Sequence, residues 1–236
     1  MVCGGQFLAE QGDEPVDPLI VRAVQMRILT ANAYFVQNAY NLRVLRHGNL
    51  LAGGVVYTEK DLADMIRQNG TKLKTGFTGT PYLLHALSDN GYADLAYDLL
   101  LQKEYPSWLY PITKGATTIW EHWDGIKPDG SFWSADMNSF NHYAYGSVAD
   151  WLYEVAAGIK IDESKPAFEH VFIKPVVHRH FMRLKASIDT KYGKVSSKWG
   201  ISANTGKVSY EIEVPNTATV IIGGKTHLLE KGIYNF

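Results

Sequence analysis

Residues 80–103, TPYLLHALSDNGYADLAYDLLLQK, decide the fold of the first part of the chain. Pro81 marks a helix start, because proline is tolerated in the first turn of a helix, and Gly91 marks a stop. A second helix is predicted over residues 92–103. Two helices joined by so short a turn form a helical hairpin, a unit that would suit a toroid of such hairpins.

The helical pattern extends to both sides of this hairpin. A long helix is predicted after Asp17, a helix-capping residue that precedes a proline. A short helix is predicted over residues 59–69, and a last one from Ser139 to Ala157, with Gly158 as its cap. The long helix has one apolar stripe at spacings of three and four, formed by Val24, Ile28, Ala31, Phe35, Ala39 and Leu42.

After Gly158 the hydrophobic period changes from that of helices to that of strands. Apolar and polar residues alternate from Val208 to Val214, which is typical of a half-buried strand. Residues 204–206, Asn-Thr-Gly, predict a hairpin turn. We therefore expect two domains, residues 1–163 and 164–236, the second an antiparallel β-sandwich with strands near 171–173, 182–188, 194–202, 207–214 and 219–222.

Composition excludes several classes of function. Apolar residues make up 46% of the chain and the formal net charge is -1, so nucleic acid and anionic membranes are poor partners. No apolar run reaches the roughly 18 residues of a membrane helix, and no signal peptide is visible, which favours the cytoplasm. The sequence has one cysteine, no phosphate-binding loop and no metal-binding motif beyond a weak His178/His180 pair, so neither cofactor nor metal is expected.

The chemistry is expected in the aromatic segment between Pro106 and Asn138, where glycines and prolines interrupt the helical pattern. Glu121 lies there between Trp120 and Trp123. A carboxylate flanked by two indoles can be partly desolvated, which would raise its pKa toward that of a general base. The residues alone leave a second interpretation open, a surface glutamate in a loop that happens to pack aromatic rings.

Residues 115–125, GATTIWEHWDG, resemble the loop of the bacterial α-L-rhamnosidases, glycoside hydrolase family 78. Residues 75–110 and 139–159 agree with that family in order and character, and 12–18, GDEPVDP, more briefly. The resemblance implies part of an (α/α)6 toroid of helical hairpins followed by a small β-sandwich. It also implies an inverting glycosidase that acts on terminal α-L-rhamnosides and takes a rhamnose-containing glycoside as its partner.

The resemblance assigns roles to individual residues. Glu121 takes the place of the general base that activates water, and His142 takes that of a histidine that hydrogen-bonds the rhamnose. Trp120, Trp123 and Asn141 are weaker candidates for the wall of the pocket. Without the resemblance, His142 would be interpreted as a capping or core histidine.

The sequence departs from the family pattern in three places. An inverting glycosidase needs two carboxylates, and the Asp- and Arg-rich segment that carries the acid in this family has no equivalent among the 236 residues. Residues 5–7, Gly-Gln-Phe, stand where the family tends to have Gly-Asp-Trp, and residues 40–56 are short by about two helices. We therefore expect the chain alone to be inactive or weakly active and to self-associate through uncovered helix faces, such as the stripe at Val24 and Phe35.

Two alternatives stay open at this point. One is another inverting glycosidase with an α/α toroid, such as a trehalase-like or glucoamylase-like enzyme, which shares the scaffold and the two-carboxylate logic. The other is a sugar-binding remnant without catalysis, in which aromatic rings and His142 still hold a sugar.

Overall fold

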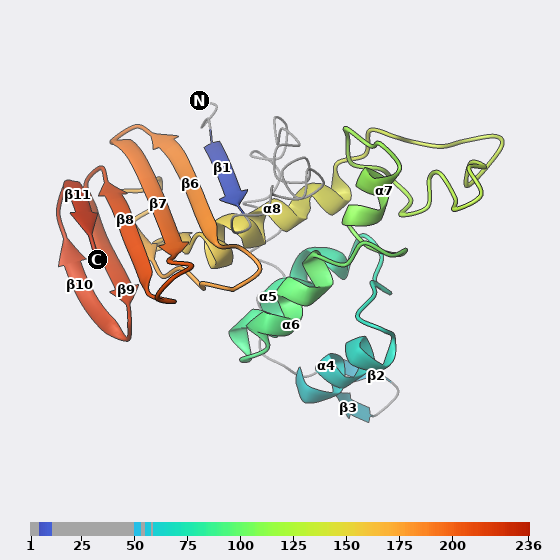
Figure 1. Cartoon of the computed structure of the whole chain (residues 1–236), viewed down its shortest axis with the longest axis horizontal. Helices are drawn as coiled ribbons and strands as arrows, with labels where there is room; N and C mark the ends of the chain where they lie inside the picture. Colours follow the sequence, from blue (N-terminus) through green and yellow to red (C-terminus); the bar gives the residue numbers. More distant parts are fainter. Residues whose placement is uncertain (1–4, 11–49, 53–54, 58) are drawn as a thin grey trace. The chain divides into compact units, whose positions relative to one another are not determined.

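The computed structural model describes residues 5–10, 50–52, 55–57 and 59–236, which fall into two compact units. The helical unit holds the described residues from 50 to 148, and the β unit holds residues 5–10 together with 149–236 (Figure 1). No helix within the described ranges combines the length and apolar character needed to cross a membrane. The predicted long helix after Asp17 and its apolar stripe lie outside the described residues, so self-association stays a prediction.

The predicted helical hairpin is confirmed. Helices α5 (Thr80–Asp89) and α6 (Ala93–Leu100) lie side by side in Figure 1, and Leu84, Leu87 and Leu99 are almost fully buried. The turn between them contains Gly91 at φ +85°, a conformation that glycine adopts without steric cost. The other elements of the helical unit are β2 (Leu50–Ala52), β3 (Val55–Tyr57), α4 (Glu59–Gln68), α7 (Leu109–Thr113) and the 3₁₀ turn η1 (Ala144–Ser147).

The last helix begins five residues later than predicted. Its helical run consists of η1, α8 (Val148–Trp151) and the π-helical η2 (Leu152–Ala156). The prediction of a start at Ser139 was wrong because the Ser139 carbonyl and the His142 amide hydrogen-bond to residues 121 and 119 instead. Backbone groups used in this way cannot also make the hydrogen bonds of a helix.

The β unit is built from two sheets. The larger has the strand order β1-β6-β7-β8-β11 and the smaller β10-β9-β5-β4 (Figure 1). All pairings are antiparallel as predicted, except that β5 and β9 pair in parallel. The strands are β1 (Gly5–Glu10), β4 (Ile159–Ile161), β5 (His170–Ile173), β6 (Arg183–Thr190), β7 (Gly193–Ile201), β8 (Val208–Val214), β9 (Thr217–Ile222), β10 (Lys225–Leu229) and β11 (Gly232–Asn235).

Five predicted strands and the predicted hairpin turn are present. Gly206 has φ +66° in the turn between β7 and β8, and Ile212 and Val214 of β8 are buried while Glu211 is exposed. Strands β1, β4, β10 and β11 were not predicted, and His178 and His180 lie in the connection before β6 rather than in a strand. Because β4 precedes residue 164, sheet structure begins earlier in the chain than expected, and the domain boundary at 163/164 stays a prediction.

The end of the last helix is fastened to the larger sheet. The indole Nε1–H of Trp199, on β7, donates a hydrogen bond of 2.9 Å to the carbonyl of Ala156, and the Trp199 side chain is buried. Gly158 then turns the chain at φ +75°, and its carbonyl accepts from the Lys174 amide at 2.9 Å. A Cβ at Gly158 would come within 2.2 Å of the Lys174 carbonyl carbon and the Pro175 nitrogen.

We predict that Gly158→Ala destabilises the β unit more than Gly206→Ala does. Both glycines have positive φ, so each alanine carries a conformational cost of about 1–2 kcal/mol, but a Cβ at Gly206 meets nothing within 4 Å. At Gly158 the backbone itself must move, and we expect a total loss of about 3 kcal/mol or more. Urea unfolding of the two variants measures the difference, and equal losses would contradict the close approach at Gly158.

Candidate functional site

Two segments far apart in the sequence pair by backbone hydrogen bonds in the helical unit. The amide of His142 donates to the carbonyl of Ile119 at 2.8 Å, and the amide of Glu121 donates to the carbonyl of Ser139 at 3.0 Å. The hydroxyl of Thr118 also donates to the carbonyl of residue 140. These bonds hold residues 118–121 and 139–142 antiparallel, so Glu121 and His142 belong to adjacent stretches of backbone.

Four aromatic rings form two stacked pairs joined by one tilted contact, a group that we call the ring column: Trp123, Tyr145, Phe77 and His142. Trp123 stacks on Tyr145 with ring centroids 3.7 Å apart, and Phe77 stacks on His142 at 4.8 Å and 13°. Phe77 also contacts Tyr145, at 4.9 Å, and so joins the two pairs. Trp108 anchors the column, because its Nε1–H donates to the Tyr145 carbonyl at 3.0 Å.

The carboxylate of Glu121 acts electrostatically on this column. Burial raises the pKa of the Tyr145 hydroxyl above its ordinary value, and the negative charge of Glu121 raises that pKa further. An anion disfavours the ionised form of a neighbouring phenol, so the effect indicates that the Glu121 carboxylate lies near the Tyr145 ring. Glu121 itself is half-buried, which leaves its carboxylate accessible to solvent.

One hydrogen bond selects the tautomer of His142. Its Nδ1 accepts from the backbone amide of Ala144 at 3.4 Å. A neutral imidazole that accepts at Nδ1 carries its proton on Nε2. The Nε2–H group has no hydrogen-bond partner among the described residues, so it is a donor available to a ligand.

The other predicted pocket residues are placed differently. Trp120 is buried and packs edge-to-face against Phe140 with centroids 5.0 Å apart. These two rings line a shallow pocket with Ile126 and Phe132, and neither Glu121 nor His142 lines it. Asn141 is exposed. The structure therefore brings together Glu121, His142 and Trp123 around the ring column but places Trp120 among other neighbours.

Sequence reasoning missed two members of the ring column. Phe77 lies in the turn Gly76-Phe77-Thr78-Gly79, and Tyr145 lies three residues after His142. A phenylalanine in a glycine-bounded turn has no helical or strand period to bury it, and Phe77 is indeed 42% exposed. The position of Phe77 outside any helical or strand pattern could therefore have identified it from the sequence. Tyr145 could not have been identified in this way, because the apolar spacing around it resembles that of an ordinary helix.

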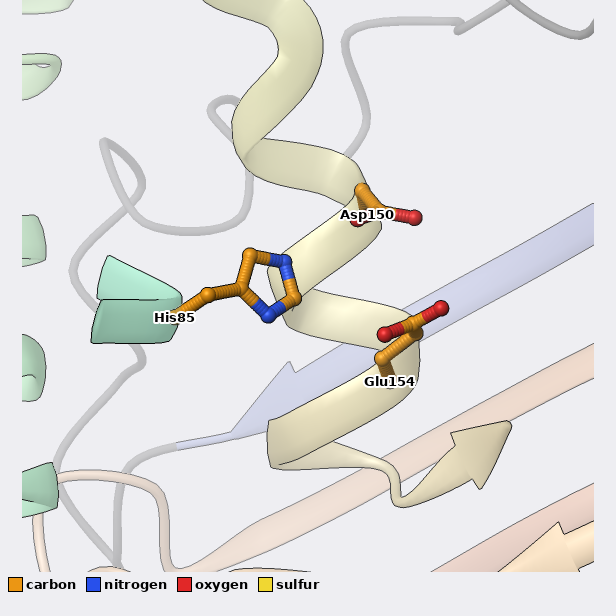
Figure 2. Close-up of side chains that lie close together, drawn as sticks. All are labelled: His85, Asp150 and Glu154. Atoms are coloured by element: carbon orange, nitrogen blue, oxygen red, sulfur yellow. The ribbon is translucent and has the colours of Figure 1, made fainter. Parts of the chain in front are cut away.

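The helix of the β unit carries two acidic side chains one turn apart. Asp150 and Glu154 project from successive turns of the α8–η2 helix (Figure 2). Glu154 Oε2 lies 4.0 Å from Lys160 Nζ, the limit for an ion pair. His85, drawn in the same figure, is a buried residue of α5 in the helical unit.

Glu121, His142 and Trp123 together offer a proton acceptor, a hydrogen-bond donor and an aromatic surface. A solvent-accessible carboxylate can accept a proton from water, and the His142 Nε2–H can donate a hydrogen bond to a hydroxyl. Aromatic rings next to them offer flat apolar surface with a polar edge. Such a combination suits a ligand that has both hydroxyl groups and C–H faces, as sugars do.

Comparison with known proteins matches both parts of the chain to domains of the same family of enzymes. The bacterial alpha-L-rhamnosidase 6 hairpin glycosidase domain matches residues 49–156, and the bacterial alpha-L-rhamnosidase C-terminal domain matches residues 158–232. An alpha-L-rhamnosidase of Streptomyces avermitilis is 46% identical over 138 residues, which are 58% of this chain. The chain spans only 13% of the length of that relative.

Solved structures of α-L-rhamnosidases are also similar to this chain. The crystal structure of an Aspergillus terreus α-L-rhamnosidase is similar with a TM-score of 0.69 and 36% identity, over 75% of this chain and 21% of that one. The Streptomyces avermitilis α-L-rhamnosidase complexed with L-rhamnose is similar over 96% of this chain and 27% of that one, with a TM-score of 0.69 and 28% identity. These matches confirm the predicted fold class, helical hairpins of a six-hairpin toroid followed by a β-sandwich.

We predict that Glu121→Gln lowers the pKa of Tyr145, because it removes the nearby negative charge that disfavours the phenolate. The pKa should stay above its ordinary value, since burial is the larger cause. Asp124→Asn is the matched control: the Asp124 charge raises the pKa of Tyr105 and Tyr110, so those two should fall instead. Titration of ¹³C-labelled tyrosines by NMR measures all three, and an unchanged Tyr145 would place Glu121 away from the ring column.

Proposed function

The chain belongs to the bacterial α-L-rhamnosidases, and from that premise we propose that its helical unit supplies the general base and part of the rhamnose pocket of an inverting α-L-rhamnosidase. One observation carries the proposal: backbone pairing of residues 119–121 with 139–142 brings Glu121 and His142 together. The likeness to a Streptomyces avermitilis enzyme whose structure holds L-rhamnose supports the choice of sugar.

Glu121 is the proposed general base. Its carboxylate takes a proton from a water molecule while the water oxygen forms a bond to the anomeric carbon of the rhamnoside. The glycosidic C–O bond breaks on the opposite face of the ring, and the leaving oxygen takes a proton from an acid, so the configuration inverts. The half-buried position of Glu121 supports this role, because the base needs access to water and some protection from bulk solvent.

His142 is the proposed sugar-binding donor. The Ala144 amide holds Nδ1 as an acceptor and thereby leaves Nε2–H to donate to a rhamnose hydroxyl. Trp123 is proposed to give the pocket an apolar wall, and the exposed Asn141 a further polar contact. Trp120 has a weaker claim, since it packs with Phe140 away from these groups.

The acid is proposed to come from a segment that these 236 residues do not include. The chain alone would then hydrolyse an ordinary rhamnoside slowly, because an alkoxide leaving group needs a proton from an acid. A leaving group that departs as a stable anion has no such need. An activated aryl rhamnoside therefore isolates the contribution of the base.

We predict that the chain slowly hydrolyses 2,4-dinitrophenyl α-L-rhamnoside but not methyl α-L-rhamnoside. Glu121→Gln should lower the activated turnover by about 10²–10⁴-fold, because it keeps the side-chain shape but removes the proton acceptor. The affinity for L-rhamnose should change little. Equal turnover of both proteins would remove Glu121 from the mechanism, and rhamnose binding without any turnover would favour the sugar-binding remnant.

Azide gives an independent check on the same residue. In Glu121→Ala, a small anion can occupy the place of the carboxylate and the water and attack the anomeric carbon without a base. The expected product is a rhamnosyl azide of inverted configuration, identified by its anomeric NMR signal. A product of retained configuration would mean that Glu121 is not the base of an inverting reaction.

We predict that His142→Ala weakens L-rhamnose binding roughly five- to tenfold, the effect of one lost hydrogen bond of about 1 kcal/mol. His122→Ala is the matched control, because the His122 ring stacks on Trp133, with centroids 3.6 Å apart, and not on a ring of the column. Calorimetric titration with L-rhamnose compares the two variants. Equal losses would show that His142 has no specific role in binding the sugar.

A further inference from the structure

Phe77 occupies a position that burial alone does not explain. Its side chain is 42% exposed, yet one face of the ring lies almost parallel to the imidazole of His142, at 4.8 Å and 13°. A phenylalanine placed for core packing would be buried against aliphatic side chains. The neighbours of Phe77 are instead the proposed sugar donor and Tyr145, the ring beside Glu121.

The turn that carries Phe77 is braced at its base. The amides of Gly79 and Thr80 both donate to the carbonyl of Gly76, at 3.2 and 3.0 Å. The hydroxyls of Thr75 and Thr80 are 2.8 Å apart, and Thr80 also donates to the Thr75 carbonyl at 3.1 Å. Since Thr80 begins helix α5, these bonds fix the turn, and with it Phe77, to the helical hairpin.

The other side of Phe77 is equally constrained. Tyr145 is buried, stacks on Trp123, and has its carbonyl held by the Trp108 indole. Phe77 is therefore wedged between a fixed tyrosine ring and the imidazole of His142. By contrast, the other contacts of the imidazole are looser: the hydrogen bond from the Ala144 amide to Nδ1 is long, at 3.4 Å, and the parallel ring of Tyr143 is 66% exposed, with its centroid 5.7 Å away.

We propose that Phe77 is a positioning residue for His142: its ring holds the imidazole in the plane in which Nδ1 accepts from the Ala144 amide and Nε2–H reaches the sugar. The inference rests on the sugar-binding role proposed for His142. It adds a residue from the α5 turn to a site that otherwise comes from residues 119–145.

The test follows the imidazole directly. In histidine-¹⁵N-labelled chain, Phe77→Ala should move the His142 ring signals and reduce the Nε2–H tautomer, whereas Phe77→Tyr should preserve both. Phe132→Ala is the matched control, because Phe132 is 58% exposed and contacts Phe140 rather than His142. Unchanged His142 signals in Phe77→Ala would overturn the proposal whether or not the chain binds rhamnose.

Affinity supplies the second readout. Phe77→Ala should raise the Kd for L-rhamnose roughly three- to tenfold, and Phe77→Tyr should stay within about twofold of the unmodified chain. In a His142→Ala background, Phe77→Ala should add less than about twofold, because the group that it positions is gone. An undiminished effect in that background would overturn the proposal by making Phe77 a sugar contact itself. If the unmodified chain binds no rhamnose, the proposed function fails, while the His142 signals still decide the role of Phe77.

Discussion

The site depends on one backbone pairing, between residues 119–121 and 139–142. Two bonds of 2.8 and 3.0 Å fix the direction and register of two segments that residues 122–138 separate in the sequence. Register matters because it decides which residues of the two segments lie next to each other, and a slip would give Glu121 and His142 other neighbours. The intervening residues 122–138 can then form an irregular excursion without disturbing either group.

The ring column gives this pairing its rigidity. Aromatic contacts at these distances contribute about 0.5–1.5 kcal/mol each beyond the area that they bury. Their larger effect here is geometric, because planar rings in contact leave few rotamers open to each other. An imidazole held by this column needs little reorganisation when a ligand arrives, and low reorganisation is what distinguishes an effective site from a loose one.

The sequence predicted what depends on local period and missed what depends on distant pairing. The α5–α6 hairpin and the strand from Val208 to Val214 follow from hydrophobic spacing, and both are present. The start of the last helix was misplaced because residues 139–142 pair with a segment that no local pattern identifies. Likewise, resemblance located Glu121 and His142, but the support from Phe77 and Tyr145 arises from contacts between the α5 turn and η1.

The same pairing bears on where the second carboxylate of the proposed inverting reaction could lie. Residues directly opposite across an antiparallel pair have Cβ atoms about 5 Å apart, whereas an inverting mechanism needs its carboxyl groups about 6.5–9.5 Å apart with water between them. The residue opposite Glu121 in this pairing is Ser139, which carries no carboxylate. Asp124, three residues on, raises the pKa of Tyr105 and Tyr110, whereas Glu121 raises that of Tyr145. The position opposite Glu121 thus offers no acid, which supports the proposal that the acid comes from another segment.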